Sequence, residues 1–164
     1  MHTITVVMLP LGACAVPPAL QLDQPDAGAN AAPIITSVSN GAAQALVEPG
    51  PVTLDRGRGT FSIALRDANP EDTLNVRLYV DYNRPDPTPP RASCRVAPGT
   101  SVNRTTTCDI SGVCTTADVG EVRLLWIEVF DREILESGLP RFRAMPSGGA
   151  SSKWQFEMQC QEPQ

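Results

Sequence analysis

The chain lacks the residues on which many active sites depend. Its 164 residues include one histidine and one lysine, and aromatic side chains make up 5%. The histidine, His2, lies in a segment that we expect to be removed, so catalytic triads, Cys/His pairs and metal sites that need imidazole are excluded from the mature chain. No GxSxG motif occurs either, and we therefore expect no enzyme activity.

Clustered positive charge is also missing. Thirteen Lys and Arg stand against 18 Asp and Glu, a formal net charge of −5, and the arginines are scattered singly. Proteins bind nucleic acids mainly through clustered Lys and Arg, so no nucleic-acid partner is expected. No stretch approaches 18 consecutive apolar residues, which excludes a transmembrane helix.

Turn-forming residues are abundant. The 16 Pro and 12 Gly favour short strands and turns over long helices, and a hydrophobic content of 41% suffices for one packed core. We therefore expect a single all-β domain.

The N-terminus has the pattern of an export signal. An apolar run at 3–11 is too short to span a membrane but suits a signal peptide, and Leu-Gly-Ala-Cys follows at 11–14. These four residues resemble a bacterial lipobox, although the first three residues contain no Lys or Arg. The resemblance implies a signal peptide at 1–13, a lipid on Cys14 and a membrane anchor, and Ala15 implies the outer membrane. The alternative is a buried strand with a chance cysteine.

The next segment, 14–32, combines the expected lipidated Cys14 with Pro, Ala, Asp and Gln and has little to bury. This composition is typical of a flexible tether. The folded domain is expected at 33–164.

The domain has the spacing of sandwich strands. Short apolar or alternating runs are separated by turn clusters and predict about seven strands, at 34–38, 60–66, 74–81, 93–97, 105–110, 121–130 and 153–160, with a short edge piece at 52–54. The runs at 93–97 and 105–110 flank Pro98-Gly99 and could form a hairpin. The run at 121–130 is apolar on both faces, as in a central strand, and changes phase, so we expect a bulge there.

Three segments resemble immunoglobulin-like, fibronectin type III-like and cadherin-like modules of bacterial surface proteins. They are Asp-Val-Gly at 118–120, the strand end at 127–131, and 65–74, which is similar to the junction between strands B and C. The resemblance implies a single immunoglobulin-like antiparallel β-sandwich.

Four cysteines remain beside Cys14: Cys94, Cys108, Cys114 and Cys160. An even number in an exported chain indicates disulfides, and four cysteines allow three pairings. A hairpin would bring the first two together, and antiparallel last strands would bring the last two together, so we favour these pairs. A Cys₄ zinc site is the alternative, but no CxxC occurs.

Acidic residues gather in two loops that a sandwich would place at one end. Asp67, Asn69 and Asp72 follow one expected strand, and Asp131 and Glu133 follow another. Calcium prefers six to eight such oxygens, and comparable loops bind calcium in cadherin-like modules. The alternative is ordinary turn chemistry, in which these side chains bond to their own backbone.

The long connection at 132–152 is the second candidate site. Connections longer than about 12 to 15 residues are usually functional or disordered. We expect a partner-binding loop with six contact residues, namely Ile134, Leu135, Leu139, Arg141, Phe142 and Arg143. Alternatively, the first two of these close the end of the core. The Pro-rich 84–90 is expected to be a stiff connection and nothing more.

These features together predict a lipid-anchored envelope protein whose sandwich acts as a non-catalytic binding or structural module. Its expected partners are the membrane, through Cys14, and another envelope protein or a polysaccharide. The alternative is a calcium- or carbohydrate-dependent adhesion module.

Overall fold

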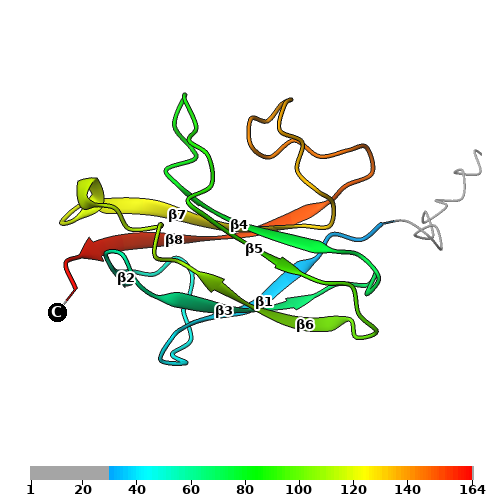
Figure 1. Cartoon of the computed structure of the whole chain (residues 1–164), viewed down its shortest axis with the longest axis horizontal. Coiled ribbons are helices and arrows are strands. Elements are labelled where there is room, and N and C mark those ends of the chain that lie inside the picture. The colour runs from blue at the N-terminus through cyan, green and yellow to red at the C-terminus, as the bar shows by residue number, and fades with distance from the viewer. Residues whose placement is uncertain (1–29, 164) are drawn as a thin grey trace, which may run out of the picture.

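The computed structural model describes residues 30–163, which form two stacked β-sheets (Figure 1). The strands are β1 (Ile34–Asn40), β2 (Val52–Asp55), β3 (Thr60–Arg66), β4 (Leu74–Val80), β5 (Ala92–Val96), β6 (Asn103–Asp109), β7 (Val122–Phe130) and β8 (Ser151–Gln161). One short 3-10 helix, η1 (Thr116–Asp118), precedes β7. Within the described range, no helix has the length and apolar character needed to cross a membrane. The expected signal peptide, Cys14 and most of the expected tether lie outside the described residues.

The sheets have three and five strands, in the orders β1-β3-β6 and β2-β8-β7-β4-β5. In the lettering of the immunoglobulin fold, β1, β3 and β6 take the places of strands A, B and E, and β4, β7 and β8 those of C, F and G. The all-β sandwich is therefore as expected, with eight strands. One pairing departs from the antiparallel pattern, because the edge strand β2 runs parallel to β8.

The expected hairpin between the fifth and sixth strands is wrong. β5 pairs with β4 in the five-stranded sheet, whereas β6 pairs with β3 in the three-stranded sheet. The connection at 97–102 therefore crosses from one sheet to the other. Pro98-Gly99 lies in this irregular connection, where the Gly99 N–H donates to the Pro70 carbonyl at 2.8 Å. A Pro-Gly pair does not determine that the flanking strands pair with each other.

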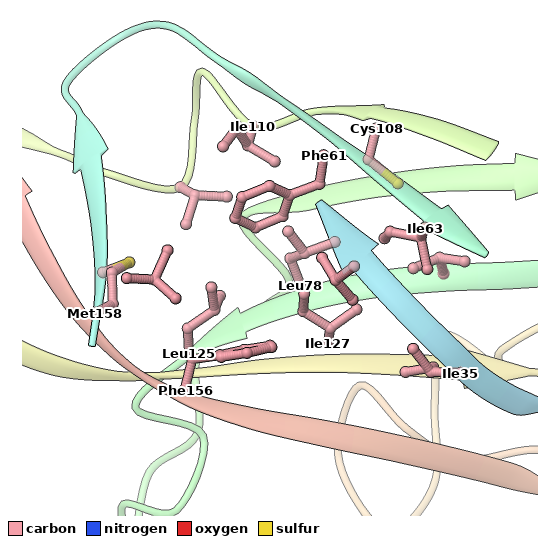
Figure 2. Close-up of a cluster of buried hydrophobic side chains, with 14 of the residues drawn as sticks. Ile35, Phe61, Ile63, Leu78, Cys108, Ile110, Leu125, Ile127, Phe156 and Met158 are labelled. Atoms are coloured by element: carbon pink, nitrogen blue, oxygen red, sulfur yellow. The ribbon is translucent and has the colours of Figure 1, made fainter. Parts of the chain in front are cut away.

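The core lies between the sheets and is built from alternate residues of each strand (Figure 2). Phe61 and Ile63 point inward from β3, Leu78 from β4, and Phe156 and Met158 from β8, and all five are fully buried. Full burial of such a side chain contributes about 1.5 to 3 kcal/mol to folding. The period-two patterns in these strands are therefore the main source of stability.

The expected bulge in the 121–130 run is also wrong. β7 pairs continuously with β4 on one side and β8 on the other, with no shift of register. Leu125 and Ile127 face the core, while Trp126 and Phe130 face the opposite side and belong to a second hydrophobic cluster. Both parities are apolar because both faces of the strand are covered. The register shift occurs instead in β1, between Ile35 and Ser37.

Each favoured cysteine pair lies at disulfide distance. The Cα atoms of Cys94 and Cys108 are 5.3 Å apart, and those of Cys114 and Cys160 are 5.7 Å apart. Both distances fall within the usual range for a disulfide. Because β5 and β6 belong to different sheets, the first pair links the two sheets rather than two strands of a hairpin. The second ties the connection before β7 to the end of β8.

Candidate functional site

The outer face of the five-stranded sheet, away from the core, is covered by a long loop. The β7–β8 loop (residues 131–150) and the β4–β5 loop (residues 81–91) both project from this side of the sandwich (Figure 1). A second hydrophobic cluster lies under the β7–β8 loop and combines five buried residues with three partly buried ones: Tyr79, Tyr82, Trp126, Phe130, Ile134, Leu124, Phe142 and Met145. The sheet therefore has apolar material on both faces over β4 and β7.

A buried ion pair fastens the β7–β8 loop to the sheet. Glu128 points to the outer face of β7 and is only 1% exposed. The Arg143 guanidinium donates to both carboxylate oxygens, with Nη2 at 2.6 Å from Oε1, and the Ser151 hydroxyl donates to Oε1 at 2.8 Å. The hydrogen bonds to Glu128 raise the pKa of Arg143 above its ordinary value. A charge at this depth is costly without such partners, so Glu128 holds Arg143 in place.

Two tyrosines hold the same loop by its backbone. The Tyr79 hydroxyl donates to the carbonyl of Phe142 at 2.7 Å, and the Tyr82 hydroxyl donates to the carbonyl of Arg141. Burial raises the pKa of Tyr79, so its hydroxyl keeps its proton and remains a donor throughout the physiological range. These contacts fix the turn at 140–143 directly over β4.

Cations stack on the aromatic rings of this cluster. The Arg143 guanidinium carbon lies 5.2 Å from the centre of the Tyr82 ring and 5.6 Å from that of Trp126, and Lys153 Nζ lies 3.8 Å from the Trp126 ring centre. These distances are within the range of cation–π attraction. The only lysine of the chain and one of its arginines are thus used to cover one tryptophan.

The six residues predicted to contact a partner divide into two sets. Ile134 is buried, Phe142 is partly buried, and Arg143 is bound to Glu128, so these three hold the loop to its own domain. Leu135 is 44% exposed, Leu139 is 90% exposed, and Arg141 is exposed and bonds to Asp86 of the β4–β5 loop at 3.1 Å. The outward set is therefore Leu135, Leu139 and Arg141.

Sequence reasoning missed the part played by the β4–β5 loop. Its Tyr82 is buried in the second cluster, and its Asp86 pairs with Arg141 of the neighbouring loop. The two loops form one connected surface. The signal in the sequence was Tyr82 itself, a large aromatic residue directly beyond the end of a strand.

The predicted acidic set is brought to one end of the sandwich, but arginines lie among it. Asp67 is buried and pairs with Arg104 at 2.7 Å, and Asp72 pairs with Arg132 at 2.9 Å. Asp131 accepts a hydrogen bond from the backbone N–H of residue 150 at 2.8 Å. Burial raises the pKa of Asp67, and the charges of Asp72 and Asp131 contribute to the rise.

Two residues of that set remain. Glu133 is exposed and pairs with Arg95 at 3.4 Å, and Asn69 donates its backbone N–H to the Asp67 side chain at 3.2 Å, the local turn bond that was the alternative to calcium. Among residues 30–163, no group of three or more His, Cys, Asp or Glu side chains has a geometry that could hold a metal ion.

A separate cleft lies away from these two loops. It measures about 450 Å³ and is lined from β1, β2 and β3, with Asn40, Asp55 and Arg58 among its polar residues. Phe61 and Ile110 underlie it, but both are almost fully buried.

Comparison with known proteins assigns no family to the chain. No protein-family model matches the sequence, and no curated protein matches it. The outer face of the five-stranded sheet, with its covering loop, is therefore selected as the candidate site on the chemistry of its own residues.

Proposed function

We propose that the chain is a lipid-anchored protein of the cell envelope whose sandwich acts as a non-catalytic module that binds another envelope protein. The binding surface is the outward side of the β7–β8 loop, namely Leu135, Leu139 and Arg141, together with Asp86 of the β4–β5 loop. The observation that carries the proposal is Leu139, an apolar side chain left 90% exposed on a loop that is fastened at several points.

A fastened loop suits a binding surface. The loop is held by the Glu128–Arg143 pair and by two tyrosine hydroxyls, so its shape is largely set before a partner arrives. Such preorganisation lowers the entropic cost of association. Arginine is enriched at protein interfaces, and the core of an interface is more apolar than its rim.

A protein partner is favoured over a polysaccharide by the burial of the aromatic rings. Tyr79, Tyr82 and Trp126 are all buried beneath the loop. They offer no open ring on which a sugar could stack. The exposed groups are instead two leucines and an arginine, and arginine is the charged residue that is enriched in protein interfaces.

The anchor would leave the domain beside the proposed surface. The Asn30 side chain donates to the carbonyl of Gly148, in the β7–β8 loop, at 2.7 Å. A lipid on Cys14, which lies outside the described residues, would thus tether this end of the sandwich to the membrane, most simply the outer membrane. Labelling cells with an alkyne-bearing fatty acid should mark the wild-type chain and leave Cys14→Ser unmarked, and that variant should leave the membrane fraction.

Site-specific photo-cross-linking in the producing cell tests the binding surface. A photo-reactive amino acid placed at Leu139 should give one discrete adduct, and the adduct should disappear when Arg141→Glu is added. The control position is Val47, which is 75% exposed in the β1–β2 connection, and this connection lies on the side opposite the β4–β5 and β7–β8 loops (Figure 1). No adduct at 139, or the same adducts from both positions, would refute the proposal.

A further inference from the structure

We propose that the groove between β5 and the β7–β8 loop binds a carboxylate, supplied by an acidic side chain of the protein partner. The groove measures about 410 Å³ and is lined by Asn75, Arg77, Ser93, Arg95 and Glu133, with the backbone of β4 and β5 as its floor. The inference rests on the proposed binding role and adds the chemistry that the partner must present.

Arg77 is the central residue of the groove. Among the residues that the structure describes, carboxylates lie within ion-pair distance of every arginine except Arg66 and Arg77. Arg77 is half-buried, and its partners among the described residues are neutral: it donates to the Phe142 carbonyl at 3.3 Å and lies beside the Tyr79 hydroxyl. A guanidinium has five N–H donors, more than these two neutral contacts use.

The nearest buried carboxylate is already engaged. Glu128 lies opposite Arg77 in the pairing of β4 with β7, but both of its oxygens accept from Arg143, and one also accepts from Ser151. Arg77 thus carries a positive charge on the outer face of β4, and the carboxylate directly opposite it is already paired with Arg143. A half-buried charge of this kind gains more from an incoming anion than an exposed charge does.

A second arginine and a hydroxyl complete the site. In the pairing of β4 with β5, Arg77 lies opposite Ser93 and Asn75 lies opposite Arg95, so the two arginines are diagonal neighbours on one face. Arg95 makes only long contacts, to Asn75 at 3.3 Å and to Glu133 at 3.4 Å, and its side chain is 60% exposed. It is therefore free to turn toward a ligand, and two guanidinium groups can bond a planar carboxylate through several donors.

Glu133 is the competing charge. Its side chain is 80% exposed and sits at the rim of the groove, on the β7–β8 loop. With two arginines and one glutamate, the lining carries a charge of about +1 on a chain whose net charge is −5. Removing Glu133 should therefore strengthen anion binding, whereas removing either arginine should weaken it.

The test is an NMR titration of the full chain carrying Cys14→Ser, which excludes lipidation. The probe is the blocked tripeptide acetyl-Gly-Glu-Gly-amide, and its uncharged match is acetyl-Gly-Gln-Gly-amide. The Glu peptide should shift the Arg77 Nε–H and the Ser93 amide with a saturating, millimolar curve, and the Gln peptide should not. Binding should weaken about threefold in Arg95→Gln and tighten about threefold in Glu133→Gln, the change expected for one partly exposed ion pair.

Arg66→Gln is the matched control, since Arg66 is the other arginine that pairs with no carboxylate of residues 30–163, and it lies on β3, in the opposite sheet. It should leave the titration unchanged, whereas Arg77→Gln should abolish it. Arg77 also contacts the β7–β8 loop, so Arg77→Gln could disturb the fold. In that case Arg95→Gln and Glu133→Gln, which leave this contact in place, test whether the groove binds a carboxylate.

Equal shifts with both peptides, or an equal loss in Arg66→Gln, would refute a carboxylate site in this groove. Tighter binding of glucuronate or of inorganic phosphate than of the Glu peptide would refute the assigned ligand class. The outcome is separable from that of the proposed function: an adduct at position 139 with no carboxylate binding refutes this inference alone. Carboxylate binding without an adduct refutes the proposed surface instead.

Discussion

The two faces of the five-stranded sheet are both covered, but by different chemistry. On the inner face, aliphatic and aromatic side chains from both sheets meet, and the buried pair of Asp67 and Arg104 lies at the end of this interface, where Arg104 is opposite Leu65. On the outer face, aromatic rings surround the buried pair of Glu128 and Arg143, and three tyrosine or serine hydroxyls bond to this pair or to the loop backbone.

The inner face therefore stabilises the fold, whereas the outer face positions the β7–β8 loop. Hydrophobic packing is strong but non-directional, and it stacks one sheet on the other. Hydrogen bonds and a buried ion pair are directional, and they hold a 20-residue loop in one place with modest net energy. Substitutions on the inner face should therefore unfold the domain, whereas substitutions on the outer face should release the loop and leave the sandwich folded.

Phe61→Ala should give the largest effect. Phe61 is fully buried between the sheets, and its truncation removes a ring and leaves a cavity, so the free energy of unfolding should fall by about 3 to 5 kcal/mol. Urea denaturation followed by tryptophan fluorescence measures the change. Leu139→Ala, at the exposed tip of the loop, is the control and should alter stability by less than about 0.5 kcal/mol. Similar losses in both variants would contradict the distinction between the faces.

Removal of the cysteine pairs should come next. The Cys114–Cys160 pair spans 46 residues and the Cys94–Cys108 pair spans 14. The chain-entropy argument gives about 4 kcal/mol for the first and about 3 kcal/mol for the second, because a longer closed loop restricts the unfolded chain more. Each double Cys→Ala variant can be compared with the oxidised wild type by urea denaturation. A larger loss from the shorter loop would show that native contacts, and not loop closure, dominate.

Several strands could be predicted because their burial has a period of two. In β8, Phe156, Met158 and Cys160 alternate with polar residues, and in β3 the same holds for Phe61 and Ile63. One face of each of these strands meets the core and the other is more open, so the pattern in the sequence is the pattern of burial.

The outer cluster could not be predicted from the same signal. Residues at both alternating sets of positions in β7 are apolar. This pattern does not distinguish a bulged strand, in which both sets face the core, from a regular strand whose outer face is covered by a distant loop. The decisive contacts of Glu128 and Tyr79 are with residues 15 and 63 positions away, in a loop without periodicity. The partner of β5 was missed for a related reason, since a turn motif does not specify which sheet the next strand joins.

Arg143→Gln should release the loop at a smaller cost. The substitution leaves Glu128 without its main partner, but the loop can lift and let water reach the carboxylate, so we expect a loss of about 1 to 2 kcal/mol rather than the full cost of an unpaired buried charge. Amide exchange in 131–150 should rise sharply while exchange in β3 and β8 stays slow. The control is Arg141→Gln, which breaks an exposed pair with Asp86 and should change neither. Uniformly faster exchange across both sheets would mean that the loop is part of the main folding unit.

Calcium should have the smallest effect of all. The carboxylates that could bind the ion already form ion pairs, Asp67 with Arg104 and Asp72 with Arg132. A divalent cation would therefore have to displace both guanidinium groups. The melting temperature should therefore stay constant to within about 1 °C between a chelator and millimolar calcium, with magnesium as the control cation. Arg132→Gln sharpens the test, because it frees Asp72 at the more exposed of the two pairs and should make any latent affinity visible. A rise of several degrees in the wild type, specific to calcium, would mean that this end of the sandwich is a metal site and would favour a calcium-dependent adhesion module over the binding surface proposed on the loop.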